Sequence, residues 1–212
     1  MSIIVSSGRV TVRAPVGTDI VQVEQLLTAK KNWIIRHLQR QLAQPAVISW
    51  QQRGEILFKG QPLPVSFGRA AKSEVQLVTC GLNINVSHRV SAAKLADWHV
   101  SLLSRWLQAQ ATAELTRRAE HWAQVMQLRY QQIVFGQWQR RWGYCDSRGR
   151  IGLNWRLIMA PQWVCDYVLV HELAHLQQMN HSALFWRVVS RHLPDYQQAQ
   201  AWLRYYQEQL TV

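Results

Sequence analysis

The chain has 212 residues, 48% of them hydrophobic, which is enough to bury the core of one domain or of a domain with two lobes. Lys and Arg number 24 against 12 Asp and Glu, and the net charge of +12 favours association with nucleic acid or another polyanion. No apolar run approaches the roughly 18 residues of a membrane span, and no signal peptide is evident at the N-terminus.

The cysteines give a first indication of the compartment. Cys80, Cys145 and Cys165 are odd in number and lack C-x-x-C spacing, which argues against a disulfide framework. We therefore expect a cytoplasmic protein in which Cys145 and Cys165 are small buried hydrophobic residues. A thiolate ligand to a metal, supplied by Cys145 or Cys165, is the alternative.

Residues 1–90 predict a lobe with more strand than helix. Val10 and Val12 alternate with polar residues as in a half-buried strand, and Asp19 predicts the cap of a helix over 19–38. Four further strands are predicted over 56–59, 63–67, 75–78 and 82–86, with a tight turn at Cys80-Gly81 between the last two.

Residues 91–212 predict a more helical lobe. Apolar residues at helical spacing indicate one long helix over 91–128, and a β-hairpin is predicted over 131–157 with its turn at 146–149. Further helices are predicted after Pro161, from Ser182 and after Pro194. The order of elements predicts an α+β fold, with residues 1–212 as a single domain.

Residues 171–181 read His-Glu-Leu-Ala-His-Leu-Gln-Gln-Met-Asn-His, an H-E-x-x-H motif followed by a third histidine. On a helix, His171 and His175 share one face, and two neutral imidazoles at that spacing can bind one Zn²⁺. His181 predicts a third ligand, and a fourth position left open is the mark of catalytic zinc. Glu172 is placed to polarise water at the metal, which predicts a zinc-dependent hydrolase, most simply of peptide bonds.

Alternatives to this site remain open in the sequence. The motif also fits an amphipathic helix whose histidines only form hydrogen bonds, although a helix apolar on almost all sides over 164–176 favours a buried metal site. The third ligand is otherwise a carboxylate on a later helix, for which Asp195 is better placed than Glu208. A left-handed turn at Asn180 is expected to direct His181 back to the metal.

A second cluster combines arginines with aromatic residues. It contains Arg140, Arg141, Arg148, Arg150 and Arg156, interleaved with Trp138, Trp142, Tyr144 and Trp155. Cationic side chains beside aromatic rings can hold single-stranded nucleic acid by neutralising its backbone and stacking on its bases. The alternative is a solvated hairpin whose Trp residues face the core.

The segment 150–156 lies just before the metal-binding helix and is a candidate for a substrate-aligning strand. An edge strand can accept an extended peptide by main-chain pairing, and Gly152 indicates a place where another backbone comes close.

Several motifs together carry a resemblance to a known family. They are Arg141-Trp142-Gly143-Tyr144-Cys145, Gly149, Leu153-Asn154-Trp155-Arg156-Leu157, Ala160-Pro161, Asp166-Tyr167-Val168, His171-Glu172-Leu173-Ala174-His175, Asn180-His181-Ser182, Phe185-Trp186 and, less specifically, Val12-Arg13-Ala14-Pro15 and Trp33-Ile34. With these motifs the chain resembles the YgjP-like family of bacterial zinc metallopeptidases over most of its length.

The resemblance implies a zincin-like metallopeptidase domain with a central metal-binding helix, a single Zn²⁺ on the three histidines and Glu172 as catalytic base. The site is also similar to that of SprT-like proteases, which digest proteins attached to DNA. One departure is Tyr144, where the family usually has a small residue. The spacing from His171 to His181 equals that of the metzincins, but Gln178 replaces their glycine and no methionine follows Met179.

The sequence thus favours a cytoplasmic zinc metallopeptidase that acts on a peptide or protein substrate and has no membrane segment. The alternatives are a nucleic-acid-binding protein whose metal serves structure only, and a protease acting on DNA-associated proteins. The residue that stabilises the oxyanion is left open among Arg141, Tyr144, Tyr167 and His192.

Overall fold

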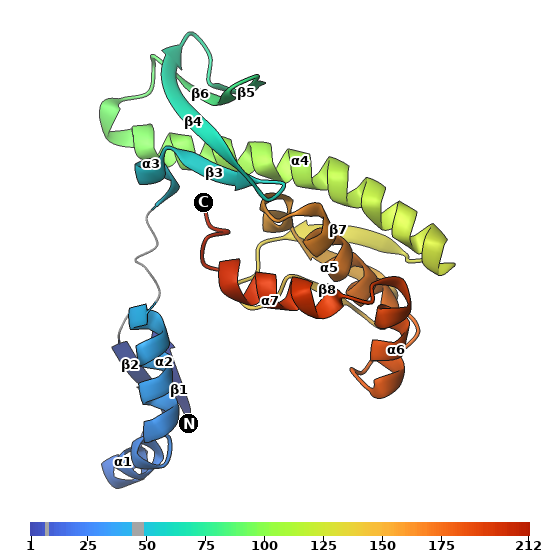
Figure 1. The fold of residues 1–212 in the computed structure, drawn as a ribbon. Coiled ribbons are helices and arrows are strands. Elements are labelled where there is room, and N and C mark those ends of the chain that lie inside the picture. Colours follow the sequence, from blue (N-terminus) through green and yellow to red (C-terminus); the bar gives the residue numbers. More distant parts are fainter. Residues whose placement is uncertain (7–8, 44–48) are drawn as a thin grey trace. The chain divides into compact units, whose positions relative to one another are not determined.

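The computed structural model describes residues 1–6, 9–43 and 49–212, which form two compact units, Met1–Val47 and Ile48–Val212 (Figure 1). This division differs from the lobe boundary predicted near residue 90. The strands that follow residue 55 pack against the long helix of the second unit and belong to it. The organisation of 1–212 as a single domain stays a prediction.

The first unit combines a two-stranded sheet with two helices. Strands β1 (Ser2–Ser6) and β2 (Arg9–Arg13) pair antiparallel, and helices α1 (Ile20–Ala29) and α2 (Lys31–Ala43) follow. Asp19 caps α1 as predicted, since its carboxylate accepts a hydrogen bond of 3.0 Å from the Val21 N–H. The helix predicted over 19–38 is broken at Lys30, whose φ of −103° and ψ of 8° end α1.

The second unit begins with the short helix α3 (Trp50–Arg53) and a mixed sheet in the order β3-β4-β6-β5. Its strands are β3 (Glu55–Phe58), β4 (Gln61–Ala70), β5 (Glu74–Val78) and β6 (Gly81–Ser87). All four predicted strands are confirmed. Strands β4 and β6 run parallel, and the side chains of Leu82, Ile84 and Val86 on β6 are fully buried.

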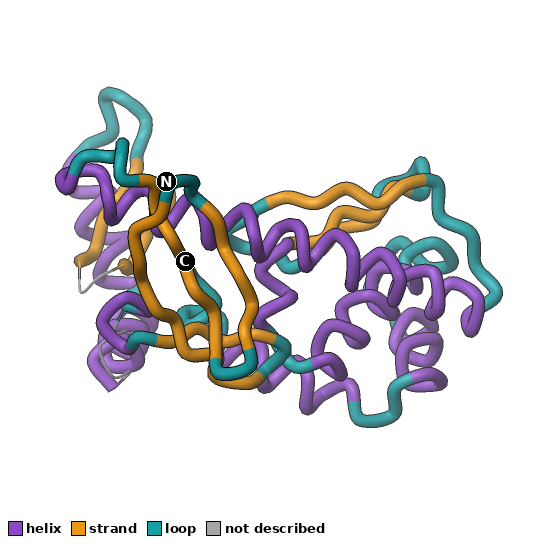
Figure 2. Tube along the Cα trace, turned by 90° about the horizontal axis from the view of Figure 1, so that it is seen from above, coloured by secondary structure: helices purple, strands orange, loops and turns teal. Residues whose placement is uncertain are grey.

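Helix α4 (Leu95–Met126) follows a 3₁₀ turn at Ala92–Lys94 and confirms the long helix predicted over 91–128. Leu103, Leu107, Ala111 and Leu115 recur every four residues and are fully buried, so that one stripe of α4 faces the core. Gln127 ends the helix in a left-handed conformation with φ of 54°. The two sheets of this unit lie beside different parts of α4 (Figure 2).

The second sheet has the order β7-β9-β8 and contains β7 (Gln132–Gly136), β8 (Gly143–Cys145) and β9 (Arg150–Asn154). The hairpin predicted over 131–157 holds for β8 and β9, whose turn closes through a 2.9 Å hydrogen bond from the Gly149 N–H to the Asp146 carbonyl. Strand β7 adds a parallel neighbour to β9 that the prediction lacked, because strands distant in sequence pair only in the tertiary structure.

This topology corrects the predicted substrate-aligning strand at 150–156. Strand β9 is central and pairs on both sides, so its backbone has no free edge for a peptide. The two edge strands are β7 and β8, of which β8 contacts α5. The close approach predicted at Gly152 is made by the Tyr144 ring, which occupies the space that a Cβ of residue 152 would need, and not by another backbone.

The C-terminal part consists of a 3₁₀ helix (Trp155–Met159) and three α-helices, α5 (Gln162–Ala174), α6 (Ala183–His192) and α7 (Tyr196–Tyr206). Helix α5 contacts α4, α6, α7 and β8, and its residues 164–170 are all buried. The predicted course of this helix through the interior is confirmed, as is the α+β fold class. None of the described helices is long and apolar enough to cross a bilayer.

A buried ion pair fastens α5 to α4. The Asp166 carboxylate accepts a hydrogen bond of 2.6 Å from Arg118 Nε and a further one from Arg118 Nη2. The Trp122 indole N–H donates to the same oxygen at 2.9 Å. These contacts place α5, which carries the H-E-x-x-H motif, relative to α4.

Candidate metal centre

The three predicted ligands come together at the C-terminal end of α5. His171 lies in the last turn of the helix, His175 caps it, and His181 lies in the connection to α6. One ring nitrogen of each lies within 4.8 Å of the others, and the Nε2 atoms of His171 and His181 are 3.0 Å apart. The four-residue spacing therefore puts two imidazoles on one helix face, and the loop returns the third.

The loop does not return in the predicted way. Asn180 is not among the described residues with positive φ, so the left-handed turn expected there is wrong. Its side-chain oxygen instead accepts a 3.3 Å hydrogen bond from the Ser182 N–H, a local turn that needs no left-handed residue. The Gln178 carbonyl lies 3.1 Å from Nδ1 of His175 and contributes to the same bend.

Two aromatic residues of α6 pack against the three imidazole rings. The ring of Phe185 is fully buried and lies 4.8, 4.6 and 4.8 Å from the rings of His171, His175 and His181. The Trp186 ring stacks on His181 at 5.8 Å with an angle of 26° between the planes. Aromatic packing thus restricts the rotamers of all three side chains.

The protonation and hydrogen bonding of the histidines fit a metal ion. Burial, together with the two other imidazoles, lowers the pKa of His171 to about 3, and burial lowers the pKa of His175. Both rings are therefore neutral, the form that binds metal. Nδ1 of His171 lies 3.4 Å from the Tyr167 hydroxyl and Nδ1 of His175 faces the Gln178 carbonyl, which leaves Nε2 of each for a metal.

The spacing of the nitrogens agrees with this assignment. Two ligands of a tetrahedral Zn²⁺ at 2.0–2.1 Å are about 3.3 Å apart, close to the 3.0 Å found between His171 and His181. The alternative ligands lie elsewhere in the described chain: Asp195 precedes α7 outside this cluster, and Cys165 Sγ donates to the Leu157 carbonyl at 3.0 Å.

Glu172 is buried beside the three histidines, with 5% of its surface exposed. Burial raises the pKa of its carboxyl to about 8, and the positive charge of Arg141 acts in the opposite direction. The backbone of Gly143 on β8 closes over this carboxyl, since a Cβ at residue 143 would lie 2.6 Å from Oε1. A side chain at residue 143 would therefore have to displace the Glu172 carboxyl.

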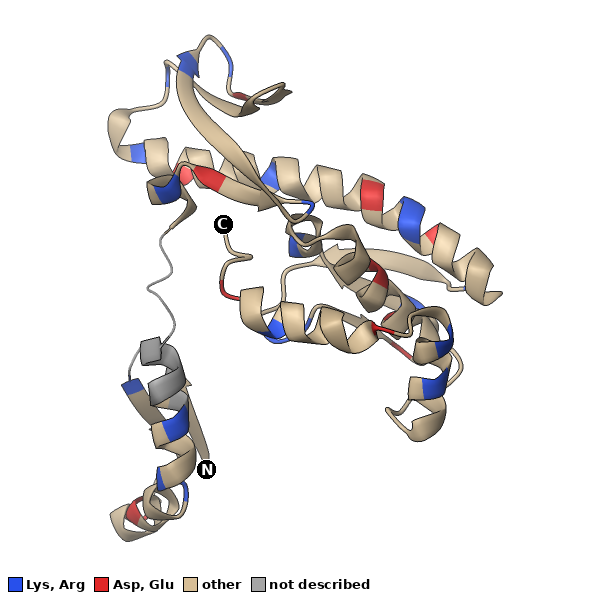
Figure 3. Cartoon of the chain, viewed as in Figure 1, with Lys and Arg blue, Asp and Glu red and all other residues tan. Residues whose placement is uncertain are grey.

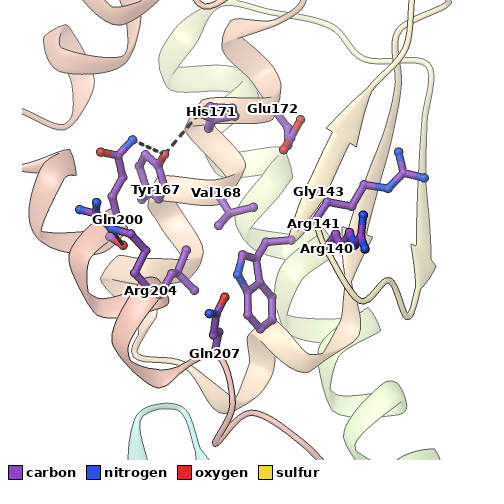
Figure 4. A pocket seen from close by; sticks show the side chains of 12 residues that line it. Arg140, Arg141, Gly143, Tyr167, Val168, His171, Glu172, Gln200, Arg204 and Gln207 are labelled. Carbon is purple, nitrogen blue, oxygen red and sulfur yellow. Dashed lines mark hydrogen bonds between the residues drawn. The ribbon is translucent and has the colours of Figure 1, made fainter. Parts of the chain in front are cut away.

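A pocket of about 500 Å³ opens next to these groups (Figure 4). Its floor is α5, with Tyr167, Val168, His171 and Glu172. One wall comes from residues 140–143, before and at the start of β8, and the other from residues 200–207 of α7 and its end. The Gln200 amide donates to the Tyr167 hydroxyl at 3.0 Å, and this hydroxyl lies 3.4 Å from Nδ1 of His171, the first predicted ligand.

The arginines predicted to bind nucleic acid occupy different places. Arg140 and Arg141 line the pocket, whereas Arg148 and Arg150 lie at the β8–β9 turn, where Arg150 forms a 2.7 Å ion pair with Asp146. Arg156 is buried and donates to the Trp138 carbonyl at 3.0 Å. Lys and Arg are distributed over elements of both units (Figure 3). Nucleic-acid binding stays a prediction without support from these contacts.

Two open oxyanion candidates, Arg141 and Tyr167, line the pocket, whereas Tyr144 and His192 are not among its lining residues. The contribution of α7 was missed altogether. Gln200 and Arg204 are four residues apart on one helix, but no sequence signal connects them to the H-E-x-x-H motif. Only the packing of α7 on α5 brings them there.

Comparison with known proteins identifies the family of the chain. No curated protein matches the chain. The crystal structure of the metallopeptidase zymogen of abylysin from Pyrococcus abyssi is similar to 46% of this chain and 99% of that one, with 20% identity and a TM-score of 0.42. The family model described as the YgjP-like metallopeptidase domain matches residues 1–206, which confirms the resemblance carried by the motifs. The chain belongs to the YgjP-like family of metallopeptidases.

Proposed function

We propose that this metallopeptidase uses one Zn²⁺ held by His171, His175 and His181, with Glu172 as general base. The observation that carries the proposal is the convergence of three imidazole nitrogens within 4.8 Å beside a buried carboxylate. Zinc at such a site would act as a Lewis acid and would lower the pKa of the water that it binds to about 7.

Glu172 provides the proton transfer in this proposal. Its carboxylate accepts the proton of the attacking water and delivers it to the nitrogen of the leaving amine. Burial alone would keep this carboxyl protonated near neutral pH. The guanidinium of Arg141 favours the ionised form, and a bound cation does so as well, because opposite charges stabilise a carboxylate.

Strand β8 is the candidate for alignment of an extended peptide. The Trp142 carbonyl accepts from the Asn154 N–H at 2.8 Å, and the Asp146 N–H donates to the Arg150 carbonyl at 3.0 Å. Because paired groups alternate along an antiparallel ladder, the backbone groups of residues 143 and 145 face away from β9. No described strand pairs there, so a peptide can add to this edge beside Glu172.

The proposal is tested by metal content and turnover of one set of variants. Purified wild type should contain one zinc per chain, and His171→Ala or His175→Ala should abolish stoichiometric metal. His181→Ala should weaken metal binding, whereas Asp195→Ala should not. If Asp195→Ala releases the metal and His181→Ala does not, the third ligand is the carboxylate.

Glu172→Gln separates the base from the metal site. The amide keeps the shape of the side chain, so zinc should remain bound while turnover of an unfolded protein falls by at least about 10²-fold. A Glu172→Gln protein with its zinc and full turnover would rule out this role. The control is Glu74→Gln on β5, which removes one exposed carboxylate and should leave turnover unchanged.

A further inference from the structure

Four arginines surround the cleft beside the metal centre. Arg140 and Arg141 on one wall and Arg204 on the other line the pocket over α5. Figure 4 shows Arg204 on the α7 side and the other two on the β8 side. An adjoining pocket of about 360 Å³ shares Arg140 and Arg141 with the first and adds Arg156.

The acidic residues of the cleft do not balance these charges. Among the described residues that line the first pocket, Glu172 is the one carboxylate, and it lies at the floor as the proposed base. Glu208 lines the adjoining pocket and has interactions of its own. A concave site with cations on both walls concentrates a positive potential on whatever occupies it.

The loop that carries Arg140 and Arg141 is held in place. The Asn154 side-chain amide is buried and donates to the Trp138 carbonyl at 2.9 Å and to the Arg141 carbonyl at 3.3 Å. The Arg141 guanidinium lies 5.3 Å from the Trp138 ring and 4.9 Å from the Tyr144 ring. These contacts give Tyr144 a structural role. Its ring packs on Gly152 and against the guanidinium of Arg141, which lines the pocket together with Glu172.

We propose that this cleft selects acidic peptides, whose carboxylates pair with Arg140 and Arg204 on its two walls. The inference rests on the proposed peptidase function and adds the substrate class. A planar guanidinium suits a carboxylate, and complementary charge gives specificity and faster association. A peptide is favoured over nucleic acid because the arginines lie on two facing walls of one cleft, whereas nucleic acid needs a continuous cationic track for its phosphates.

Binding is measured on zinc-loaded Glu172→Gln protein, so the result does not depend on turnover. Fluorescent peptides with two internal Asp or Glu residues are compared with their Asn or Gln counterparts, each with a free or an amidated C-terminus. We expect about tenfold tighter binding of the acidic peptides at low ionic strength. The exchange of Asp or Glu for Asn or Gln tests recognition of side-chain carboxylates, and amidation tests recognition of the C-terminal carboxylate. A preference for either carboxylate supports the proposal.

Variants locate the preference in the cleft. Arg140→Gln together with Arg204→Gln should reduce the tenfold advantage to about twofold or less, and Arg204→Glu should reduce it more than Arg204→Gln does. The matched control is Arg105→Gln on α4, an exposed arginine outside both pockets, which should leave the preference unchanged. Arg141 is left intact because it acts on Glu172.

Equal binding of acidic and amide peptides, or an advantage that survives the double variant, would overturn the proposal. It is also overturned if oligodeoxythymidylate binding, but not peptide preference, depends on Arg140 and Arg204. Wild-type turnover on the same peptides is recorded separately. Absence of cleavage would refute the peptidase mechanism, whereas the binding comparison would still decide the specificity of the cleft.

Discussion

Replacing Asp166 tests whether the buried ion pair holds the metal-binding helix in place. The side chains of Asp166 and Arg118 are only 12% and 10% exposed, and Asp166 also accepts from the Trp122 indole. Asp166→Ala leaves the buried Arg118 without this carboxylate, a loss that costs about 3–5 kcal/mol of the free energy of unfolding. For a unit of this size, the midpoint temperature of thermal unfolding should fall by about 6–20 °C.

The assay is thermal and urea unfolding of the metal-free protein, followed by circular dichroism and tryptophan fluorescence. Arg117→Ala is the matched control, because it breaks the Arg117–Glu114 pair one residue away on α4, where the Arg117 side chain is 65% exposed. The Arg117→Ala change should lower the free energy of unfolding by less than about 1 kcal/mol.

A second variant separates a buried charge from a general packing defect. Asp166→Leu combined with Arg118→Met removes both charges, and should recover at least half of the loss seen in Asp166→Ala, since no charge remains buried without its partner. An Asp166→Ala protein destabilised by less than about 1 kcal/mol would refute the reasoning. A double variant no more stable than the single one would do the same.

Two further outcomes follow from the site and its surroundings. Gly143→Ala should lower peptide turnover by at least about tenfold with zinc retained, because the new Cβ would lie 2.6 Å from Glu172 Oε1 and displace the carboxyl; unchanged turnover would contradict this. Burial raises the pKa of Cys165 to about 12 and that of Cys145 to about 11, so both thiols stay protonated at pH 8. Iodoacetamide should therefore modify the exposed Cys80 first, and mass spectrometry that finds Cys165 modified as rapidly would show the prediction to be wrong.

The convergence of His171 and His175 was predictable because it depends mostly on local geometry. The four-residue separation of His171 and His175 fixes one helix face before any tertiary contact is known. The apolar residues around the motif likewise indicated a buried helix, and α5 is buried. Spacing alone also predicted that His181 lies near these two residues, although the turn expected at Asn180 is absent.

Elements with strong local periodicity were also predictable. The long helix α4 and the strands from β3 to β6 lie close to their predicted ranges, since their apolar repeats match one secondary structure. The break at Lys30 was not visible, because helical residues continue on both sides of it.

Only the tertiary structure decided which strand has a free edge and what surrounds the metal centre. Strand β9 lies between β7 and β8 in the sheet and has no free edge, and residues 140–143, before and at the start of β8, line the cleft. The α7 wall, with Gln200 and Arg204, comes from residues about thirty positions after the motif. The sequence by itself determined the cluster of three histidines, whose spacing is local, whereas the cleft depends on contacts between distant segments that no periodicity records.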